Sequence, residues 1–561
     1  MARRFTVHER RAVRDLAGAW DFTFLGEADP DTVDVAAIAF DEIMAVPGCF
    51  DAVPDHAGAR GLAAYRLRVP IERAGRHRLA FDGVHHWCRV FWDGRPVRDH
   101  AGGFTAFSAD VERAEAGTAE VIVLVDNRIG SLSPLHMEHA DWYHFGGIAR
   151  GAELHRLPHA WIEGLRVATE DAGAGRFSLR VDYRADAPGP VPLLVECGGR
   201  VLAEETVELD ASGTVERAFE LPGAETWSPS NPALHTIAVR LGEDDMRERF
   251  GLREITTEGG RVTVGGERLT LLGFNRHESH PQFGHTQPLP LLLADVQQIR
   301  DLGCNFIRGS HYPQDPMFLD LCDELGICVW SETIGWQYPA ELLQDPEFVE
   351  AQREHLDEMV AAAINHPSII VWGILNECPS YAPEARGAYE RLLGRLRELD
   401  PTRPVTYATL NVYGDLCLDL VDVVAVNTYP GWYFGGVDEV PRELDKIAAH
   451  VAEAGHGDKP LLVSEIGAGA VPGWRDAHRG MWTEEYQSEL LGAAVRHVID
   501  DDRFAGIAIW VLGDFRTTEH KEMLLKRPRS VNDKGVLDEY RRPKRAYETV
   551  RELFRGAPQQ N

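Results

Sequence analysis

The chain has 561 residues, of which 44% are hydrophobic, 26% charged and 9% aromatic, a globular composition that excludes disordered and fibrous proteins. This length is too great for one hydrophobic core and predicts roughly three or four domains. The 88 acidic and 58 basic residues give a net charge of −30, which argues against nucleic acid or an anionic membrane as the main partner.

Residues 1–158 contain short alternating or apolar runs separated by Gly, Asp and Pro: AAYRLRV, HRLAFDG, CRVFWDG, AEVIVLVDN and AELHRL. This spacing predicts an antiparallel β-sandwich. Residues 159–254 form a second β-rich block with the runs WIEGLRVATED, FSLRVDYR, PVPLLVECGG and HTIAVRLG. The length and strand count of this block predict an immunoglobulin-like sandwich.

Residues 255–561 change period, because helical stretches such as LADVQQIRDLG and FVEAQREHLDEMVAAAI alternate with short apolar runs. Eight strands that alternate with helices over this length are the pattern of a (β/α)8 barrel. Each strand is nearly all apolar because both of its faces are buried. The eight runs are LTLLGFN, CNFIRGS, ICVWSE, IIVWGILNE, PVTYATL, VVAVNTY, LLVSE and IAIWVLGDF.

One apolar run, IIVWGILNEC at residues 369–378, ends in Asn376 and Glu377. A buried charge costs several kcal/mol unless it is paired or used, so Glu377 taken alone is interpreted as a solvated loop residue. In barrels, however, catalytic residues lie at the C-terminal ends of the strands. Polar residues follow nearly every predicted strand: His277, Glu278, Arg308, His311, Tyr312, Glu332, Asn376, Glu377, Asn427, Tyr429, Glu465, Trp510 and Asp514.

Two of these residues are carboxylates that close the fourth and seventh apolar runs, Glu377 and Glu465. We expect them to face each other across the mouth of the barrel. A pair of carboxylates facing a sugar can hydrolyse a glycoside, since one protonates the leaving oxygen while the other attacks or activates water. A separation of about 5 Å predicts retention through a covalent glycosyl-enzyme.

The eight cysteines stand singly, with no C-x-x-C pair or His/Cys cluster. Neither a disulfide framework nor a structural zinc site is therefore indicated. The basic N-terminal stretch has no apolar segment behind it, and no run approaches the roughly 18 apolar residues of a membrane span. We expect reduced thiols in a cytoplasmic protein.

Four strand-end patterns resemble glycoside hydrolase family 2: GFNRHESHP, NFIRGSHYP, ILNEC and LLVSEIG. The resemblance covers nearly the whole chain, and FDGVHHWCRVFWDG with HAGGFTAF is similar to the jelly-roll domain of that family. Within the family the chain is most similar to the β-glucuronidases, through VNTYPGWY, MWTEEYQ and VNDKGVLDEYRRPK. The resemblance implies a jelly-roll domain, an immunoglobulin-like domain and a catalytic barrel at residues 1–158, 159–254 and 255–561.

The resemblance also implies roles for individual residues. Glu377 is the expected general acid/base and Glu465 the expected nucleophile. A like charge and partial burial are expected to raise the pKa of Glu377, while hydrogen bonds keep Glu465 ionised. Asn376 is expected to bond the sugar 2-hydroxyl, Tyr429 and Arg308 to donate to Glu465, His277, Tyr433 and Trp510 to line the sugar subsite, and Asn532 and Lys534 to grip the sugar carboxylate.

Several positions leave alternatives open. Asp141, in HADWYHFGGIAR, matches a jelly-roll residue of the glucuronidases that reaches over the barrel. The alternative interpretation is an ordinary loop aspartate. Glu332 has a structural, metal-binding or catalytic role, and His311 is more typical of a scaffold residue. The family arginine before the N-x-K pattern is replaced by Pro528, which leaves Arg529 or Arg527 to take its place.

The sequence thus predicts a retaining exo-β-glucuronidase that needs no metal or organic cofactor. Its expected partner is a small-molecule glucuronide or a uronic-acid-terminated oligosaccharide, and the resemblance implies a homo-oligomer. No long loop is inserted after the third barrel strand, so we expect an open aglycone side. A β-galacturonidase or β-galactosidase is the nearest alternative. A catalytically silent sugar-binding protein is a further one, although it predicts loss of a carboxylate and both are present.

Overall fold

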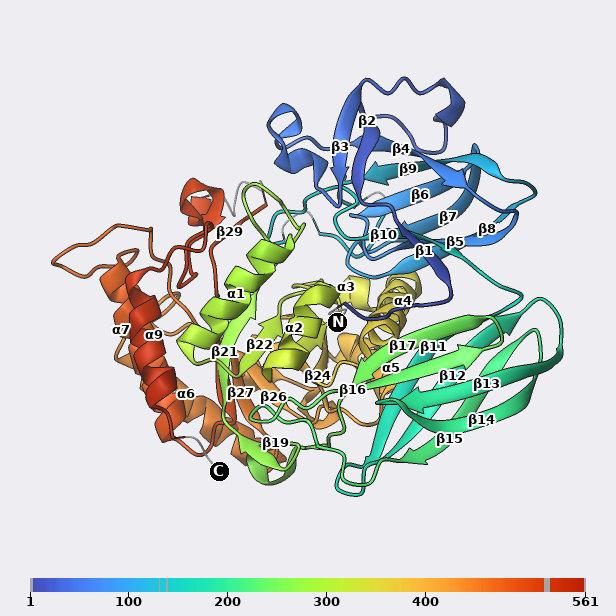
Figure 1. Ribbon diagram of the computed structural model, residues 1–561. Coiled ribbons are helices and arrows are strands. Elements are labelled where there is room, and N and C mark those ends of the chain that lie inside the picture. The colour runs from blue at the N-terminus through green and yellow to red at the C-terminus, as the bar shows by residue number, and fades with distance from the viewer. Residues whose placement is uncertain (1–3, 131, 138–139, 519–524, 559–561) are drawn as a thin grey trace.

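The computed structural model describes residues 4–558 apart from 131, 138–139 and 519–524. The chain folds into two β-sandwiches followed by an α/β barrel, and the first sandwich lies against one end of the barrel (Figure 1). The predicted fold class is confirmed. No helix of the described residues is long and apolar enough to cross a membrane.

The first sandwich packs a six-stranded sheet, in the order β3-β2-β4-β9-β6-β7, against a four-stranded sheet, in the order β1-β10-β5-β8. Alternate side chains of the two sheets point inward and form one apolar core, for example Trp20, Leu79 and Val123. The strands are β1 (Ala12–Asp15), β2 (Gly18–Gly26), β3 (Glu42–Val46), β4 (Leu62–Ile71), β5 (Gly75–Phe81), β6 (Trp87–Trp92), β7 (Arg95–Ala101), β8 (Phe107–Arg113), β9 (Gly117–Asp126) and β10 (Ala152–Arg156).

The second sandwich pairs the sheets β11-β12-β15 and β14-β13-β16-β17. All four predicted runs are strands, whereas β14, β15 and β17 were not predicted. β14 and β15 carry acidic and basic residues at exposed positions, and β17 carries charged residues that are buried or partly buried, so the apolar signal of all three strands is weak. The strands are β11 (Ala160–Asp171), β12 (Arg176–Ala185), β13 (Gly189–Cys197), β14 (Arg200–Leu209), β15 (Ser212–Glu220), β16 (His235–Leu241) and β17 (Asp244–Phe250).

Eight parallel strands close the barrel in chain order, from β21 to β28. Each of the eight predicted runs supplies one strand, and every residue of these strands is buried because helices cover one face and the barrel interior the other. The strands are β21 (Leu271–Arg276), β22 (Phe306–Gly309), β23 (Cys328–Glu332), β24 (Ile369–Ile374), β25 (Val405–Thr409), β26 (Val424–Asn427), β27 (Leu461–Glu465) and β28 (Gly506–Ile509).

Aspartate and threonine caps start several barrel helices. Asp315 and Asp345 each accept a backbone N–H two residues on, with a proline at the first helical position, and Thr483 accepts the N–H of Tyr486. The helices are α1 (Leu289–Leu302), α2 (Pro316–Leu325), α3 (Ala340–Leu343), α4 (Pro346–Ala363), α5 (Arg386–Leu399), α6 (Glu439–Val451), α7 (Glu484–Asp500) and α9 (Arg545–Gly556).

A small sheet closes the N-terminal end of the barrel. Its strands β18 (Ile255–Thr256), β19 (Val262–Val264) and β20 (Glu267–Leu269) precede β21, and Val262 and Leu269 share one apolar cluster with the barrel residues Trp330 and Ala508. At the C-terminal end, the first sandwich covers part of the barrel mouth, since the Phe104 ring stacks on Tyr312 at 3.8 Å. The remaining opening therefore lies at the C-terminal ends of the strands.

Candidate active site

Glu377 and Glu465 lie at the open end of the barrel. Glu465 is the last residue of β27, and Glu377 follows β24 by three residues. Glu377 has a φ of 54° and Leu375 a φ of 42°, in the left-handed region that costs a non-glycine residue on the order of 1–3 kcal/mol. The Glu377 N–H donates to the Ala408 carbonyl at 2.9 Å and holds this conformation. Backbone strain of this kind is typical of functional sites.

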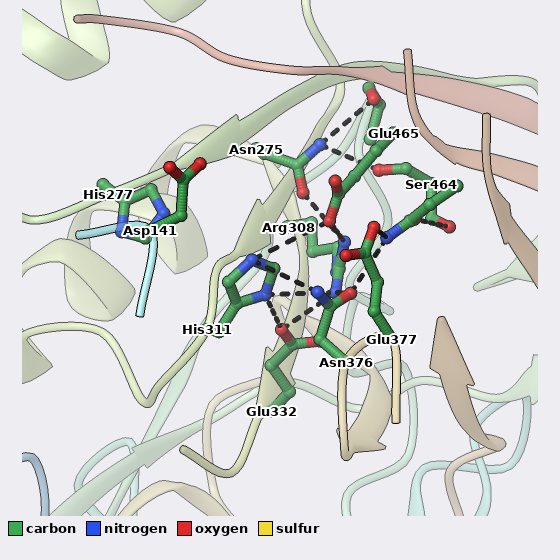
Figure 2. Close-up of polar contacts among 12 residues, drawn as sticks. Asp141, Asn275, His277, Arg308, His311, Glu332, Asn376, Glu377, Ser464 and Glu465 are labelled. Carbon is green, nitrogen blue, oxygen red and sulfur yellow. Dashed lines mark hydrogen bonds and ion pairs between the residues drawn. The ribbon is translucent and has the colours of Figure 1, made fainter. Parts of the chain in front are cut away.

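The fully buried Arg308 connects the residues around Glu465 (Figure 2). It donates to Glu465 Oε1 at 2.9 Å and to Asn376 Oδ1 at 2.8 Å. Its other edge donates to the two oxygens of Glu332 at 3.1 and 3.0 Å. The Tyr429 hydroxyl donates to the second oxygen of Glu465 at 2.6 Å. Both residues predicted as donors thus contact Glu465.

Glu377 accepts its hydrogen bonds from neutral amides. Asn427 Nδ2 donates to Glu377 Oε1 at 2.8 Å, and Gln337 Nε2 donates to Oε2 at 2.8 Å. The Ser464 hydroxyl donates to Asn427 Oδ1 at 2.7 Å, so the NH2 group of Asn427 faces Glu377. The same NH2 group donates to Asn376 Oδ1 at 3.0 Å. Asn376 is therefore held between the two carboxylates by hydrogen bonds.

The two carboxyls differ in their donors although burial affects both. Burial raises the pKa of Glu377, and burial together with the charge of Glu377 raises the pKa of Glu465 to about 8. The hydrogen bonds expected at Glu465 are present, but they do not offset its burial. Two buried carboxyls whose protonation is linked share one proton near neutral pH. Of the two candidate catalytic carboxyls, only Glu465 accepts a hydrogen bond from the charged Arg308. The geometry therefore favours the proton on Glu377.

His277 and Trp510 line the mouth next to the carboxylates. Their rings meet edge to face at 5.4 Å, and His277 Nδ1 lies 3.1 Å from the Tyr312 hydroxyl. His311 stacks on Trp510 at 5.2 Å, and its Nδ1 lies 2.7 Å from Glu332 Oε1. Since Glu332 is buried against both Arg308 and His311, its contacts are those of a structural ion pair.

A second polar cluster joins the first sandwich to the segment after β28. Asp141 accepts from Asn532 Nδ2 at 2.7 Å and from Arg527 Nε and Nη2 at 3.1 to 3.2 Å. Asn532 ends β30 (Val531–Asn532), which pairs with β29 (Phe515–Arg516). Asp141 thus extends from the jelly roll to the N-x-K pattern, while His139 of the same stretch lies outside the described residues.

Lys534 is a buried ammonium without an anionic partner. Its side chain donates to the Tyr433 hydroxyl at 3.2 Å, and its nitrogen lies 5.3 to 5.6 Å from the ring centres of Tyr429, Trp432 and Tyr433. It forms no ion pair with any described residue. Burial, and then the charge of Arg527, lower the pKa of Lys534. An anionic ligand would offset both the cost of burying the ammonium and its repulsion from Arg527.

Arg527, and not Arg529, joins this cluster. Arg529 donates to Asp533 at 2.6 Å and to Glu539 at 2.9 Å, and its side chain is 41% exposed. Arg529 and Ser530 have φ values of 61° and 57°, and this left-handed turn sends the two arginine side chains in different directions. The choice of Arg529 as the substrate-binding arginine therefore does not agree with the structure.

A pocket of about 290 Å³ lies beside Glu377. Gln337 and Asn411 supply polar atoms to its wall, and Tyr381 and Leu410 are each 52% exposed along it. The short segment after β23 contributes Gln337, Tyr338 and Pro339 to the wall of this pocket. The pocket and the Lys534 cluster are therefore two distinct regions beside the carboxylates, one with exposed apolar groups and one cationic.

Two protein-family models match the chain, one in its N-terminal part and one in its C-terminal part. The model described as glycosyl hydrolases family 2, sugar binding domain matches residues 13–158, and the family 2 TIM barrel domain matches residues 255–557. The chain belongs to glycoside hydrolase family 2. It is therefore a glycoside hydrolase, and the sequence resemblance to this family is confirmed.

Individual family 2 proteins are similar to this enzyme over their whole length. A β-galacturonidase from Eisenbergiella tayi, solved with galacturonate bound, is 34% identical, with a TM-score of 0.93 and 100% of both chains covered. A Bifidobacterium dentium β-glucuronidase complexed with coumarin-3-O-glucuronide is 27% identical, with a TM-score of 0.88 and coverage of 99% and 98%. The Paenibacillus borealis β-glucuronidase is 27% identical over 96% of both chains.

Some residues of this family 2 site could not be found by sequence reasoning. Gln337 lies in an irregular segment, and it reaches Glu377 because Trp336 pairs with Asn376 in an isolated bridge. Ser464 reads as an ordinary strand residue, although it orients Asn427. The one sequence signal for Ser464 is its position as a polar residue directly before Glu465, the glutamate that ends the strand.

Proposed function

We propose that this family 2 enzyme is a retaining exo-β-uronidase that hydrolyses β-D-glucuronides. The observation that carries the proposal is Lys534, a buried ammonium 2% exposed and without an anionic partner among the described residues. A buried charge is costly unless it is paired, so a ligand carboxylate is the natural partner. Asn532 and Arg527 stand beside Lys534 and add donors of the kind that carboxylates bind.

The catalytic steps follow from the two carboxyls. Glu465 Oε attacks the anomeric carbon, while Glu377 gives its proton to the glycosidic oxygen and the aglycone leaves as an alcohol. Glu377, now ionised, removes a proton from water, and the water oxygen displaces Glu465 from the sugar with net retention. Arg308 and Tyr429 hold the nucleophile, and Asn376 is placed to bond the sugar 2-hydroxyl in the transition state.

A β-galacturonide is the second candidate substrate. The Eisenbergiella tayi β-galacturonidase shares more sequence with this chain than the β-glucuronidases named above, at 34% against 27%. The two sugars differ at the 4-hydroxyl, which is the neighbour of the carboxylate-bearing carbon. Asp141 bonds both Arg527 and Asn532, which are proposed to bind the carboxylate, so Asp141 is placed to contact that hydroxyl in the proposed binding mode.

One panel of substrates tests the proposal. We expect 4-nitrophenyl β-D-glucuronide to be turned over with the highest kcat/KM, the matched galacturonide more slowly, and the galactoside least. Proton NMR of the first-formed sugar should show the β-anomer. A higher kcat/KM for the galacturonide would replace the first candidate by the second. Preference for the galactoside would contradict the uronidase proposal, and an initial α-anomer would exclude retention.

A further inference from the structure

Three histidines of the first sandwich converge in a buried cluster outside the catalytic centre. His86 directly precedes β6, and His136 and His144 lie on either side of Asp141 along the chain. Their exposed fractions are 1%, 3% and 1%. The ring centres of His86 and His136 lie 5.0 and 5.1 Å from that of His144, and 4.0 Å from each other. One ring nitrogen of each lies within 4.8 Å of the other two.

Several ring nitrogens of this cluster lack hydrogen-bond partners among the described residues. Neither ring nitrogen of His86 has a hydrogen-bond partner among the described residues, and neither does His136 Nε2. The other nitrogen of His136 lies 2.9 Å from the Ser133 hydroxyl oxygen. A buried polar atom without a partner costs about 1–3 kcal/mol, and native structures contain few of them. A ligand that accepts several imidazole lone pairs at once would remove this cost.

A second His/Asp cluster shows the contrasting case. Asp320, Asp323 and His366 also place ligand atoms close together. There, however, His366 Nδ1 lies 2.6 Å from Asp323, and Arg249 donates to Asp320 at 2.9 Å. Those atoms are satisfied by the protein itself, which makes the cluster an ion-pair network. The three histidines of the sandwich differ from this ion-pair network, because ring nitrogens of the three histidines have no partner in the described part of the chain.

We propose that His86, His136 and His144 bind one transition-metal ion of the zinc class. Imidazole nitrogens suit Zn²⁺, Co²⁺, Ni²⁺ and Cu²⁺, whereas Mg²⁺ and Ca²⁺ require oxygen ligands. Nitrogens of a tetrahedral zinc site lie about 3.4 Å apart, so the rings need to move by only on the order of 1 Å. A water molecule or a hydroxide completes the coordination.

The surroundings of the cluster fit a metal ligand set. Burial lowers the pKa of all three imidazoles, so they are neutral, which is the form that binds metals. In the tautomer that binds metal through Nε2, His136 Nδ1 would donate to the Ser133 hydroxyl oxygen 2.9 Å away, an arrangement common around metal-bound histidines. The charge of Arg60 acts on His86 and His144, and Arg60 itself forms an ion pair with Asp51 at 3.7 Å.

The site would fix a substrate-binding segment. Asp141 lies between His136 and His144, and Trp142 contacts the His144 and His277 rings at 5.3 and 5.5 Å. An ion bound by both histidines would hold this segment to the end of the sandwich sheet. The metal therefore has a positioning role and takes no part in bond cleavage. This role rests on the proposed function, whereas metal binding itself does not.

The experiment uses the full chain without an affinity tag. After dialysis against a chelator, the protein is titrated with Zn²⁺ or Co²⁺, and bound metal is measured by elemental mass spectrometry. We expect about one tightly bound ion per chain and a higher Tm in its presence, since a ligand that binds only the native state stabilises it. With Co²⁺ we expect the visible absorption of a four-coordinate site.

Variants separate the site from adventitious binding. His136→Gln should lose the stoichiometric ion, and Ser133→Ala should weaken binding by about 10- to 100-fold because it removes only the hydrogen bond to a ligand. His155→Gln, which changes a buried histidine of β10 that contacts Glu153, should bind like the wild type. The absence of both bound ion and Tm increase in the wild-type chain would overturn the proposal even if a variant fails to fold. Equal binding by His136→Gln would also overturn it.

Discussion

At the scale of single residues, the roles proposed for Glu465 and Glu377 can be tested separately. Glu465→Gln should abolish turnover of every substrate, because no covalent step proceeds without a nucleophile. Glu377→Gln should slow hydrolysis about 100- to 10,000-fold for substrates with poor leaving groups, and much less for nitrophenyl glycosides, whose leaving group hardly needs a proton. Comparing kcat/KM for nitrophenyl and alkyl glucuronides checks both. Near-normal activity of Glu465→Gln would sink the assignment.

We propose that Lys534 distinguishes acidic from neutral sugars. Removing a charge-assisted bond to a buried carboxylate costs roughly 2–4 kcal/mol, so Lys534→Met should lower kcat/KM for the glucuronide by about 30- to 1000-fold. Any weak galactoside activity should stay almost unchanged. Both substrates are compared with the same protein preparations.

The free enzyme supplies the control for Lys534. Because its ammonium is buried and has no anionic partner among the described residues, Lys534→Met should not lower the Tm. A residue that serves the fold would behave differently. A lower Tm together with equal loss of activity on acidic and neutral sugars would make Lys534 structural.

The shared proton of the carboxyl pair predicts a bell-shaped pH profile. Activity requires one proton on the pair, so kcat/KM should fall at low pH, where both carboxyls are protonated, and again at high pH, where the last proton is lost; because the pKa of both carboxyls is raised, both limbs should lie above the range of ordinary glutamates. Tyr429→Phe removes a hydrogen bond that favours ionised Glu465. Its acidic limb should therefore shift to higher pH. An acidic limb that stays in place would show that this hydrogen bond does not tune the nucleophile.

At the scale of elements, apolar pattern predicts strands better than it predicts the turns between them. Every barrel strand was found from its sequence because burial on both faces leaves an uninterrupted apolar run. The positions of Arg527 and Arg529 could not be found in this way, since a left-handed turn at Arg529 decides which one faces Asp141. The histidine cluster was missed for a related reason, because His86 and His136 are brought together only by the fold.

The pocket beside Glu377 lies next to the short segment between β23 and α3, and we predict that it binds the aglycone. Tyr381 lies in its wall and is half-exposed. Stacking of an aromatic aglycone on a tyrosine is worth about 0.5–1.5 kcal/mol. Tyr381→Ala should therefore raise KM for aryl glucuronides by about 2- to 12-fold and leave KM for methyl glucuronide unchanged.

An exposed tyrosine outside the pocket, Tyr540, offers a matched control for Tyr381. Tyr540→Ala should leave the KM values of the aryl and the methyl substrates as they are in the wild type. If Tyr381→Ala affects both substrates alike, the pocket does not bind the aglycone.

At the scale of the whole molecule, the net charge of −30 opposes an anionic substrate. Long-range repulsion lowers the concentration of glucuronide near the barrel mouth, and salt weakens it because the Debye length shortens from about 30 Å at 0.01 M to about 10 Å at 0.1 M. The proposed contacts of the sugar carboxylate with the buried Lys534 and Arg527 are short-range, so salt should screen them much less. Raising the ionic strength over this range should therefore increase kcat/KM for the glucuronide.

The neutral galactoside is the control for the salt effect, since its encounter with the protein does not depend on the charge of the molecule. Its kcat/KM should stay constant over the same range of ionic strength, which also excludes a general effect of salt on the fold. A fall in glucuronide kcat/KM with salt would mean that the local field of Lys534 and Arg527 extends beyond the pocket and outweighs the acidic surface. Substrate capture would then be steered by the cationic cluster, instead of depending on contacts made only after entry.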